Sequence, residues 1–282
     1  MGIMQNKIDF VMLVSVTNAN PNGDPLNGNR PRSDYDGVGE MSDVCIKRKI
    51  RNRLQDMGES IFVKSDDRCD DGYISLKQRA DSSGLKSIKN REEFEKIACE
   101  KWIDVRAFGQ VFAFSDFGCK SVGVRGPVSI HQARSISSVE IESMQITKST
   151  SGDRKTEGER GSDTMGTKHF VRFGLYEIKG SINVQLAEKT GFTEEDTEKI
   201  KEALKTLFMN DASAARPDGS MEVEKLYWWK HDCKDGQYSS AKVHRLVKVE
   251  PKDSSKIPNS IDDYNITLGE LPNLAVEIFD GL

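Results

Sequence analysis

Residues 8–16 are apolar at every position except Asp9 and Ser15. β-forming side chains on both alternations predict a central strand that is covered on both faces. Residues 18–32 follow and are rich in Asn, Gly, Pro and Asp, which supply turns and left-handed backbone positions. This second segment predicts an ordered loop without regular structure.

The pattern changes to a helical period after Ser42, a suitable N-cap residue, and Gly58 marks the expected end of the helix. The apolar face of this helix consists of Ile46, Ile50, Leu54 and Met57. At about 100° per residue, Lys47 and Arg51 lie together on one flank and Arg48 lies just beyond them. The opposite flank is formed by Lys49 and Arg53. The helix therefore carries basic flanks beside an apolar face.

Further elements follow along the chain. Residues 92–102 predict a short helix, and Thr193 caps a strongly amphipathic one. The apolar stripe of the second helix consists of Ile200, Ala203, Leu204, Leu207 and Phe208. Alternating hydrophobicity predicts a strand at 181–187, and further strands are predicted at 242–250 and 274–279.

The order of these elements favours an α+β fold, a sandwich of the ferredoxin-like type, with residues 1–282 forming one elaborated domain. Insertions are expected after the first helix and near 140–170. Aromatic residues between 104 and 117 are expected in a core rather than on a binding surface. Residues 147–164 contain no hydrophobic residue, so they predict a mobile excursion that cannot bury a core.

Composition excludes several classes of protein. A chain of 282 residues with 36% hydrophobic residues is long and apolar enough for a real core, unlike a disordered or fibrous protein. The apolar stretch at 8–16 is too short to cross a bilayer, and no secretory signal pattern precedes it, so a cytoplasmic protein without a membrane partner is expected. The five cysteines form no CxxC pair, which argues against structural zinc, and no cofactor is expected. The run His231-Asp232-Cys233 is interpreted as surface.

The distribution of charge says more than the net charge of -4. Residues 30–53 contain seven Lys or Arg against four Asp or Glu, whereas residues 251–282 contain two against six. Chance unevenness on a solvated surface is one interpretation of this difference. The other is a protein that binds a polyanion on its basic side.

Two catalytic interpretations of the loop at 18–32 fail on residue types. Gly23 and Gly28 have the spacing of a phosphate-binding P-loop, but Asn29 and Arg30 stand where that motif needs Lys and then Ser or Thr. A second possibility is a divalent metal held by acidic residues, for which the candidates are Asp24, Asp34 and Asp36. Aspartates in turns more often accept backbone hydrogen bonds, so the turn interpretation is favoured.

A loop with many free N–H groups beside a basic helical flank suits a nucleic-acid backbone, although most charge runs are merely solvated faces. The residues of this constellation are also recognisable. The blocks 18–25 and 42–52 resemble the CRISPR-associated Cas seven (Cas7) family, in its type I-C branch, the backbone subunit of Cascade. Further matching blocks follow in order across the chain, at 104–109, 126–128, 133–136, 165–169 and 174–176.

The resemblance implies an RRM-like palm with finger and thumb insertions, which would be residues 60–125 and 140–170. It implies a non-catalytic subunit that polymerises head to tail along CRISPR RNA, blind to the spacer sequence, in antiviral defence. The implied partners are CRISPR RNA, target DNA through the guide, further copies of the chain, other Cascade subunits, and a separate helicase-nuclease that cuts. Binding through the sugar-phosphate backbone implies a salt-dependent affinity.

The residues expected to bind RNA form three groups. Phosphate and sugar contacts are expected from Asn20, Asn22, Arg30, Arg32, Lys47, Arg48 and Arg51. A second group, expected in a loop after the central strand, consists of Gln132, Arg134 and Ser135. At the base of the thumb, Lys168 and His169 are weaker candidates, and Met165 is a candidate apolar wedge.

Two alternatives stay open at this point. One is an enzyme, a metal-dependent RNase subunit of a type III-like effector that uses Asp24, Asp34 or Asp36. The other is a protein scaffold that binds no nucleic acid.

Overall fold

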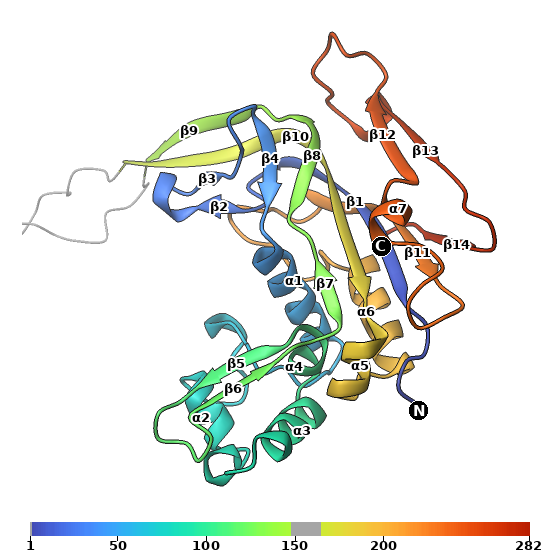
Figure 1. The fold of residues 1–282 in the computed structure, drawn as a ribbon. Coiled ribbons are helices and arrows are strands. Elements are labelled where there is room, and N and C mark those ends of the chain that lie inside the picture. Colours follow the sequence, from blue (N-terminus) through green and yellow to red (C-terminus); the bar gives the residue numbers. More distant parts are fainter. Residues whose placement is uncertain (1, 148–164) are drawn as a thin grey trace, which may run out of the picture.

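The computed structural model describes residues 2–147 and 165–282. The polar excursion predicted at 147–164 thus lies outside the described residues, apart from Thr147. Strand β1 (Ile8–Ala19) runs through the middle of an antiparallel sheet, between β10 (Met165–Ile182) and β11 (Met221–Lys230) (Figure 1). None of the described helices is long and apolar enough to cross a membrane.

The main sheet has the strand order β14-β11-β1-β10-β8-β4, and β7 and β9 pair with different parts of the long strand β10. The remaining strands of this sheet are β4 (Val38–Met41), β7 (Val128–Ile130), β8 (Ala133–Ser138), β9 (Ile141–Thr147) and β14 (Val276–Phe279). This arrangement confirms a mixed α/β fold with a central antiparallel sheet. The ferredoxin-like palm stays a prediction.

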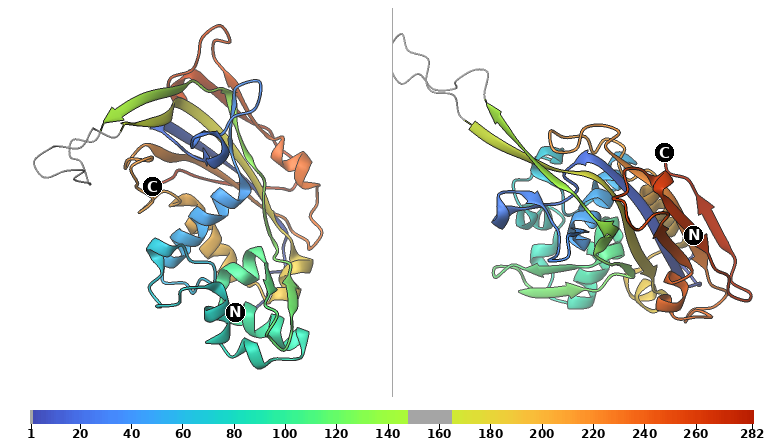
Figure 2. Two further views of the ribbon diagram at one scale, coloured as in Figure 1. Left: turned by 90° about the vertical axis from the view of Figure 1, so that its left-hand side faces the viewer. Right: turned by 90° about the horizontal axis from the view of Figure 1, so that it is seen from above.

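The two faces of β1 are buried in two different hydrophobic clusters, which confirms the prediction for 8–16. Phe10, Met12 and Val14 face the main core and pack with apolar residues of three helices. These helices are α1 (Asp43–Asp56), α5 (Val184–Thr190) and α6 (Glu194–Lys205). Figure 2 shows the helices on one side of the sheet and the C-terminal strands on the other.

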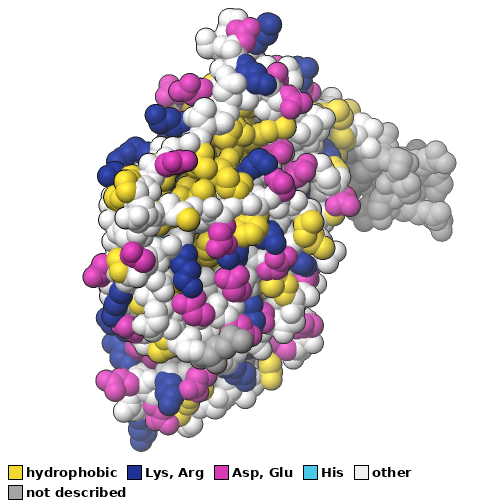
Figure 3. All heavy atoms as spheres, turned by 90° about the vertical axis from the view of Figure 1, so that its right-hand side faces the viewer, with side chains coloured by type: hydrophobic (Ala, Val, Ile, Leu, Met, Phe, Trp, Pro, Cys, Tyr) yellow, Lys and Arg dark blue, Asp and Glu magenta, His cyan; other side chains and the backbone are white. Residues whose placement is uncertain are grey.

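The opposite face of β1, with Val11 and Leu13, packs under a C-terminal layer. This layer contains α7 (Ser240–His244), β12 (Val247–Pro251) and β13 (Tyr264–Leu268). Figure 3 looks onto this side and shows hydrophobic side chains gathered on the surface among charged ones. Partly buried residues of this cluster include Ile266, Leu268 and Val276. Burial of both faces explains why β1 has no polar alternation.

Most buried apolar residues of the segment 60–125 form a second hydrophobic cluster below α1, while Ile61, Ile103 and Ala107 belong to the main core. The prediction of aromatic residues in a core is confirmed there, because Phe112 and Phe117 are buried and Phe112 packs against Phe62 and Phe94. The segment contains α2 (Leu76–Asp81), α3 (Arg91–Lys101), α4 (Ile103–Phe108), β5 (Gln110–Ala113) and β6 (Ser121–Val124). Its role as a finger stays a prediction.

Gly109 and Gly126 lie where this segment joins the main sheet. Gly109 has φ of 78°, and a Cβ atom there would lie 2.4 Å from the carbonyl oxygen of Val124. A Cβ atom on Gly126 would lie 2.3 Å from the carbonyl oxygen of Ala107. The two backbones therefore meet at a distance that only glycine permits.

Helix boundaries predicted from capping residues are confirmed. The Ser42 hydroxyl accepts a hydrogen bond from Cys45 N, and Thr193 forms a capping box with Asp196. Helix α3 corresponds to the helix predicted at 92–102, and β14 to the strand predicted at 274–279.

Three predictions of local structure were wrong. The strand expected at 181–187 ends at Ile182, because the Asn183 side chain caps α5 by accepting a hydrogen bond from Leu186 N. The segment 242–250 is divided between α7 and β12. The loop at 18–32 contains a small hairpin of β2 (Gly23–Asp24) and β3 (Arg30–Pro31) around a 3-10 helix, Pro25–Asn27.

His231 is buried, so its interpretation as a surface residue was wrong; Asp232 and Cys233 are exposed. The His231 Nε2 atom lies 2.9 Å from Asp9 Oδ2, while its Nδ1 accepts a hydrogen bond from Gln237 N. This pairing identifies the neutral tautomer with the proton on Nε2. Asp9 is the polar exception in β1, and Lys7 Nζ also donates to it at 3.0 Å. On the side of the C-terminal layer, His244 Nε2 of α7 lies 3.8 Å from Asp9 Oδ1, so this layer too approaches the carboxylate of the central strand.

Asp9→Asn is expected to lower the free energy of unfolding at pH 7 by about 3 kcal/mol, since it breaks a buried charge network. Burial raises the pKa of Asp9, but hydrogen bonds from His231, Ser240 and Lys7 hold it below its usual value. Its stabilisation is therefore present above about pH 4 and lost as the pH falls through the lowered folded-state pKa. Urea unfolding across this range checks the prediction.

The difference between wild type and Asp9→Asn should shrink below about pH 4. Asp218→Asn, on an exposed loop, is the control and should leave stability unchanged at either pH. A difference between wild type and Asp9→Asn that stays constant with pH would contradict the ionised role given to Asp9.

Candidate nucleic-acid interface

The small β2–β3 hairpin is joined to the N-terminus of α1 through asparagine side chains. Asn22 Oδ1 accepts hydrogen bonds from Ser42 N at 2.9 Å and from Ser42 Oγ at 3.0 Å. Asn20 is buried, and its Nδ2 donates to Asn29 O at 2.7 Å. Both predicted amides thus hold the loop in shape. Among the described residues, Asn20 Oδ1 has no hydrogen-bond partner.

Arg30 and His169 are brought together across the hairpin and the β9–β10 arm. Arg30 Nη1 donates to Ser143 Oγ at 2.8 Å and lies 3.3 Å from His169 Nδ1. Ser143 pairs with His169 in the strand register, and its Oγ is 2.9 Å from the same ring nitrogen. Ser143 was not predicted, because only the pairing of β9 with β10 places it beside two predicted residues.

The arm formed by β9 and β10 projects from the body of the molecule (Figures 1 and 2). Lys168 lies opposite Met144 in the register, on the face that also carries Ile146. Met165, the predicted wedge, is 65% exposed on the other face, and Gln145 Nε2 lies 3.1 Å from its sulfur. The predicted Lys168 and Met165 are therefore on opposite faces of one exposed arm.

The second predicted group lies on and before strand β8 rather than in a loop. Arg134 forms an ion pair with Asp34, and Gln132 is exposed. Ser135 is buried, and its hydroxyl accepts a hydrogen bond from Gly39 N and donates one to Ser137 O. Ser135 thus connects β8 to β4.

The turn interpretation of the aspartates is confirmed for two of them. Asp24 accepts a hydrogen bond from Leu26 N and pairs with Arg32 at 3.3 Å. Asp34 Oδ1 accepts from the backbone N–H groups of Asp36 and Val38. Within the described part of the chain, no group of three or more His, Cys, Asp or Glu could hold a metal ion.

The basic flank of α1 is divided between solvent and the segment 60–125. Lys47 pairs with Asp43 at 3.0 Å within the first turns of the helix. Arg48 Nη1 donates to Val63 O at 2.6 Å, and burial lowers its pKa with Arg51 adding to the effect. Spacing therefore correctly predicted the shared flank, but tertiary contacts decide which charges remain available.

Arg51 binds a carboxylate at the junction with the segment 60–125. Its Nε donates to Asp104 Oδ2 at 3.0 Å, and Asp104 is fully buried. The same carboxylate accepts from Phe62 N at 2.7 Å and from Val63 N at 3.1 Å. Arg51 thus fastens α1 to this segment, and its side chain is only 12% exposed.

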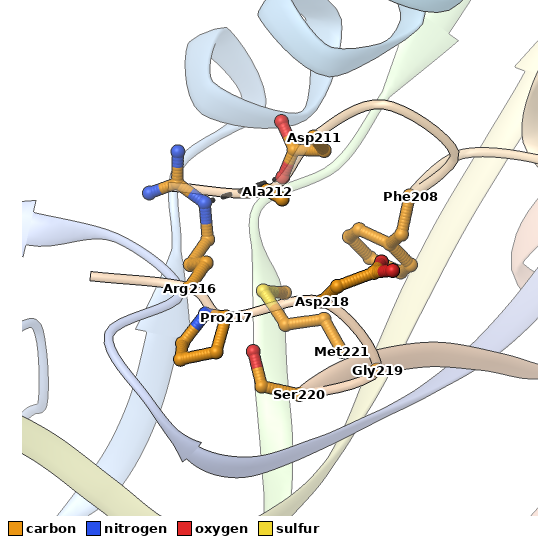
Figure 4. A pocket seen from close by; sticks show the side chains of 9 residues that line it. All are labelled: Phe208, Asp211, Ala212, Arg216, Pro217, Asp218, Gly219, Ser220 and Met221. Carbon is orange, nitrogen blue, oxygen red and sulfur yellow. Dashed lines mark hydrogen bonds and ion pairs between the residues drawn. The ribbon is translucent and has the colours of Figure 1, made fainter. Parts of the chain in front are cut away.

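A further cluster of charges lies between α1 and the loop 211–220, and the sequence did not predict it. Lys49 is almost fully buried and pairs with Asp211, whose Oδ2 also accepts a hydrogen bond from Arg216 Nε at 3.2 Å (Figure 4). Burial raises the pKa of the Cys45 thiol, while Lys49, Arg216 and Arg32 act to lower it. Three cationic groups therefore act on the pKa of this thiol, against the effect of burial. No local motif marks Arg216.

Comparison with known proteins decides the family. The model of the family described as "CRISPR-associated protein Cas7" matches residues 6–269. The chain belongs to the Cas7 family.

A curated protein of Haloferax volcanii, described as CRISPR-associated protein Cas7, is 25% identical to this chain over 296 residues, covering 98% of this chain and 84% of the relative. Among solved structures, a chain of a "CRISPR RNA-guided surveillance complex, pre-nicking" is similar with a TM-score of 0.50 and 15% identity, covering 84% of this chain and 81% of the other. A chain of a "CRISPR RNA-guided surveillance complex" has a TM-score of 0.48 and 14% identity, with coverages of 84% and 74%. The first structural likeness shows that the fold is shared with such a chain.

For this Cas7 family member, Arg51→Ala is expected to lower the free energy of unfolding by about 3 kcal/mol, because it leaves the buried Asp104 carboxylate without its cation. Lys47→Ala should cost only about 0.5 kcal/mol, since its pair with Asp43 is a helix-surface pair. Urea unfolding of both variants measures the difference. Equal stability of the two variants would contradict the structural role assigned to Arg51.

Proposed function

We propose that this chain is a non-catalytic backbone subunit of a type I-C Cascade surveillance complex, which polymerises along CRISPR RNA and presents the guide to target DNA. The match of the Cas7 family model across residues 6–269 carries this proposal. The structural likeness to a chain of an RNA-guided surveillance complex supports it.

The chemistry of the interface supports contacts with the RNA backbone rather than with bases. Its solvent-facing groups include Arg30, Arg32, Arg134 and Lys168, whose N–H groups suit phosphate oxygens. Among the described residues, Tyr35 is the aromatic residue in the set of exposed large hydrophobic side chains. These cations are therefore not accompanied by a series of exposed aromatic rings on which RNA bases could stack. Binding that is blind to the spacer sequence follows from such a surface.

The predicted residues then divide by their contacts. Arg30, Arg32, Lys47, Gln132, Arg134, Lys168 and His169 are proposed to contact RNA directly. Asn20, Asn22, Arg48, Arg51 and Ser135 are proposed to hold the surface in shape, since each bonds a main-chain group of the protein or, for Arg51, the buried Asp104. Met165 keeps its proposed role as the wedge between neighbouring guide bases.

Head-to-tail assembly with further copies is supported by apolar surfaces on different sides of the molecule. The arm exposes Met144, Ile146 and Met165, and the C-terminal face carries the hydrophobic group seen in Figure 3. Surfaces that differ in this way form heterologous contacts, which propagate as an open filament. Other Cascade subunits and a recruited helicase-nuclease complete the proposed set of partners.

The non-catalytic assignment is supported by the contacts of the loop aspartates. The carboxylates of Asp24 and Asp34 are occupied by backbone N–H groups and by Arg32 and Arg134. A carboxylate in such an ion pair is a poor ligand for a metal ion, because the cation would compete with the arginine.

Arg30→Ala combined with Lys168→Ala is expected to weaken binding of single-stranded RNA and to reduce its dependence on salt. Each lost phosphate contact should lower the slope of log affinity against log salt by about 0.7. Fluorescence anisotropy with two RNAs of unrelated sequence, at several NaCl concentrations, measures both quantities. Both sequences should respond alike.

Arg91→Ala is the matched control, because Arg91 is an exposed arginine on α3 outside the interface. Its salt slope should equal that of wild type. An unchanged slope in the double variant, or a strong preference for one RNA sequence, would argue against backbone binding by these residues.

Incubation of the assembled protein and guide with complementary RNA and either Mg²⁺ or Mn²⁺ is expected to leave the RNA intact. Gel electrophoresis over a time course detects any cleavage. Cleavage at regular intervals that disappears in Asp34→Ala would overturn the non-catalytic assignment and favour the RNase alternative.

A further inference from the structure

The loop 211–220 lies beside the predicted interface and contacts α1 through the pair of Lys49 and Asp211. Its Ala215 carbonyl accepts a hydrogen bond from Asn20 N at 2.9 Å, and its Ser220 carbonyl accepts one from Thr17 N at 2.8 Å. The loop is therefore held against the end of β1, where the chain enters the β2–β3 hairpin. Arg216 lies in this loop, next to the asparagine-rich segment 18–32.

Two cations pair with the one carboxylate of Asp211, while the exposed Asp218 of the same loop has no ion pair with either of them. One carboxylate oxygen of Asp211 interacts with both Lys49 and Arg216, so a single negative charge faces two positive ones. Burial lowers the pKa of Lys49, and Arg216 adds to this effect while Asp211 opposes it. Arg32 adds a third cation near Cys45, and that arginine is paired with Asp24. One positive charge therefore has no counter-charge in the group.

The part of Arg216 that is not engaged by Asp211 is available to a ligand. Asp211 contacts Nε only, and the terminal nitrogens Nη1 and Nη2 have no hydrogen-bond or ion-pair partner in residues 2–147 and 165–282. The side chain is 28% exposed. Figure 4 shows these two nitrogens pointing away from Pro217, Ser220 and Met221. A planar pair of N–H donors of this kind matches two oxygens of a phosphate.

We propose that Arg216 binds a backbone phosphate of the RNA through its terminal nitrogens, and that Asp211 holds this arginine in place when RNA is absent. The phosphate supplies the negative charge that the group of Lys49, Asp211 and Arg216 lacks. The interface then extends from α1 and the hairpin onto the adjoining loop 211–220. This inference rests on the proposed RNA-binding function and extends its site.

Two variants of different expected effect test the inference. Arg216→Ala should weaken binding of single-stranded RNA and lower the slope of log affinity against log salt by about 0.7, the loss of one phosphate contact. Asp211→Asn leaves the buried Lys49 without its partner and should lower stability, but it keeps the phosphate contact of Arg216, so its slope should equal that of wild type. Anisotropy titrations with one RNA at several salt concentrations measure both effects.

A purely structural role for Arg216 predicts a different result. If the arginine only anchors the loop through Asp211, both substitutions loosen the same loop and change the slope alike. Arg216→Lys keeps the positive charge but lacks the planar pair of N–H donors. Its slope of log affinity against log salt should therefore stay near that of wild type. Arg106→Ala breaks an arginine–aspartate pair with Asp196 outside the interface, and it should lower stability without changing the slope.

An unchanged slope in Arg216→Ala, or a slope lowered equally in Arg216→Ala and Asp211→Asn, would overturn the inference while wild-type binding leaves the proposed function intact. Wild-type protein that binds no RNA would overturn both.

Discussion

Both faces of strand β1 are hydrophobic and must be buried, and the rest of the molecule is arranged around this constraint. Its alternate side chains enter two separate hydrophobic clusters, so the sheet needs helices on one side and a C-terminal layer on the other. The single buried carboxylate of the strand, Asp9, contacts Lys7 and His231 and lies 3.8 Å from His244 of the second layer. Both layers are thus specified from one strand.

The same strand also positions the interface. Strand β10 pairs with β1 along its length and then continues past it, where it pairs with β9 to form the projecting arm. The chain leaves β1 directly into the β2–β3 hairpin, which Asn22 joins to the start of α1. Arm, hairpin, helix and the loop 211–220 therefore meet at one end of the central strand pair. A rigid core holds cationic groups that lie far apart in the sequence.

Much of the core could be predicted from the sequence because periodicity and capping are local. The two-sided burial of β1, the face of α1 and the capped start of α6 were all predicted correctly. The strand expected at 181–187 failed because Ile182 and Val184 alternate like a strand while Asn183 between them caps a helix. His231 was misplaced because its partner, Asp9, is distant in the sequence.

The interface was predictable in outline only. The basic flank of α1 follows from helical spacing, but whether a cation faces solvent depends on its acidic neighbours in the fold. Arg51 is paired with Asp104 and Lys49 is paired with Asp211, and no local sequence pattern predicts either ion pair. Arg216 has no predictive motif for the same reason. Membership of the Cas7 family supports the proposed class of ligand, which helical spacing alone could not indicate.

Co-expression of the chain with a CRISPR array and the other subunits, followed by purification by size and sequencing of the bound RNA, tests the central claim most directly. The account predicts a large assembly that holds guides of uniform length with varied spacers. An RNA-free monomer purified from the same cells would contradict it, because the cationic groups at the end of β1 would then have no polyanion to bind.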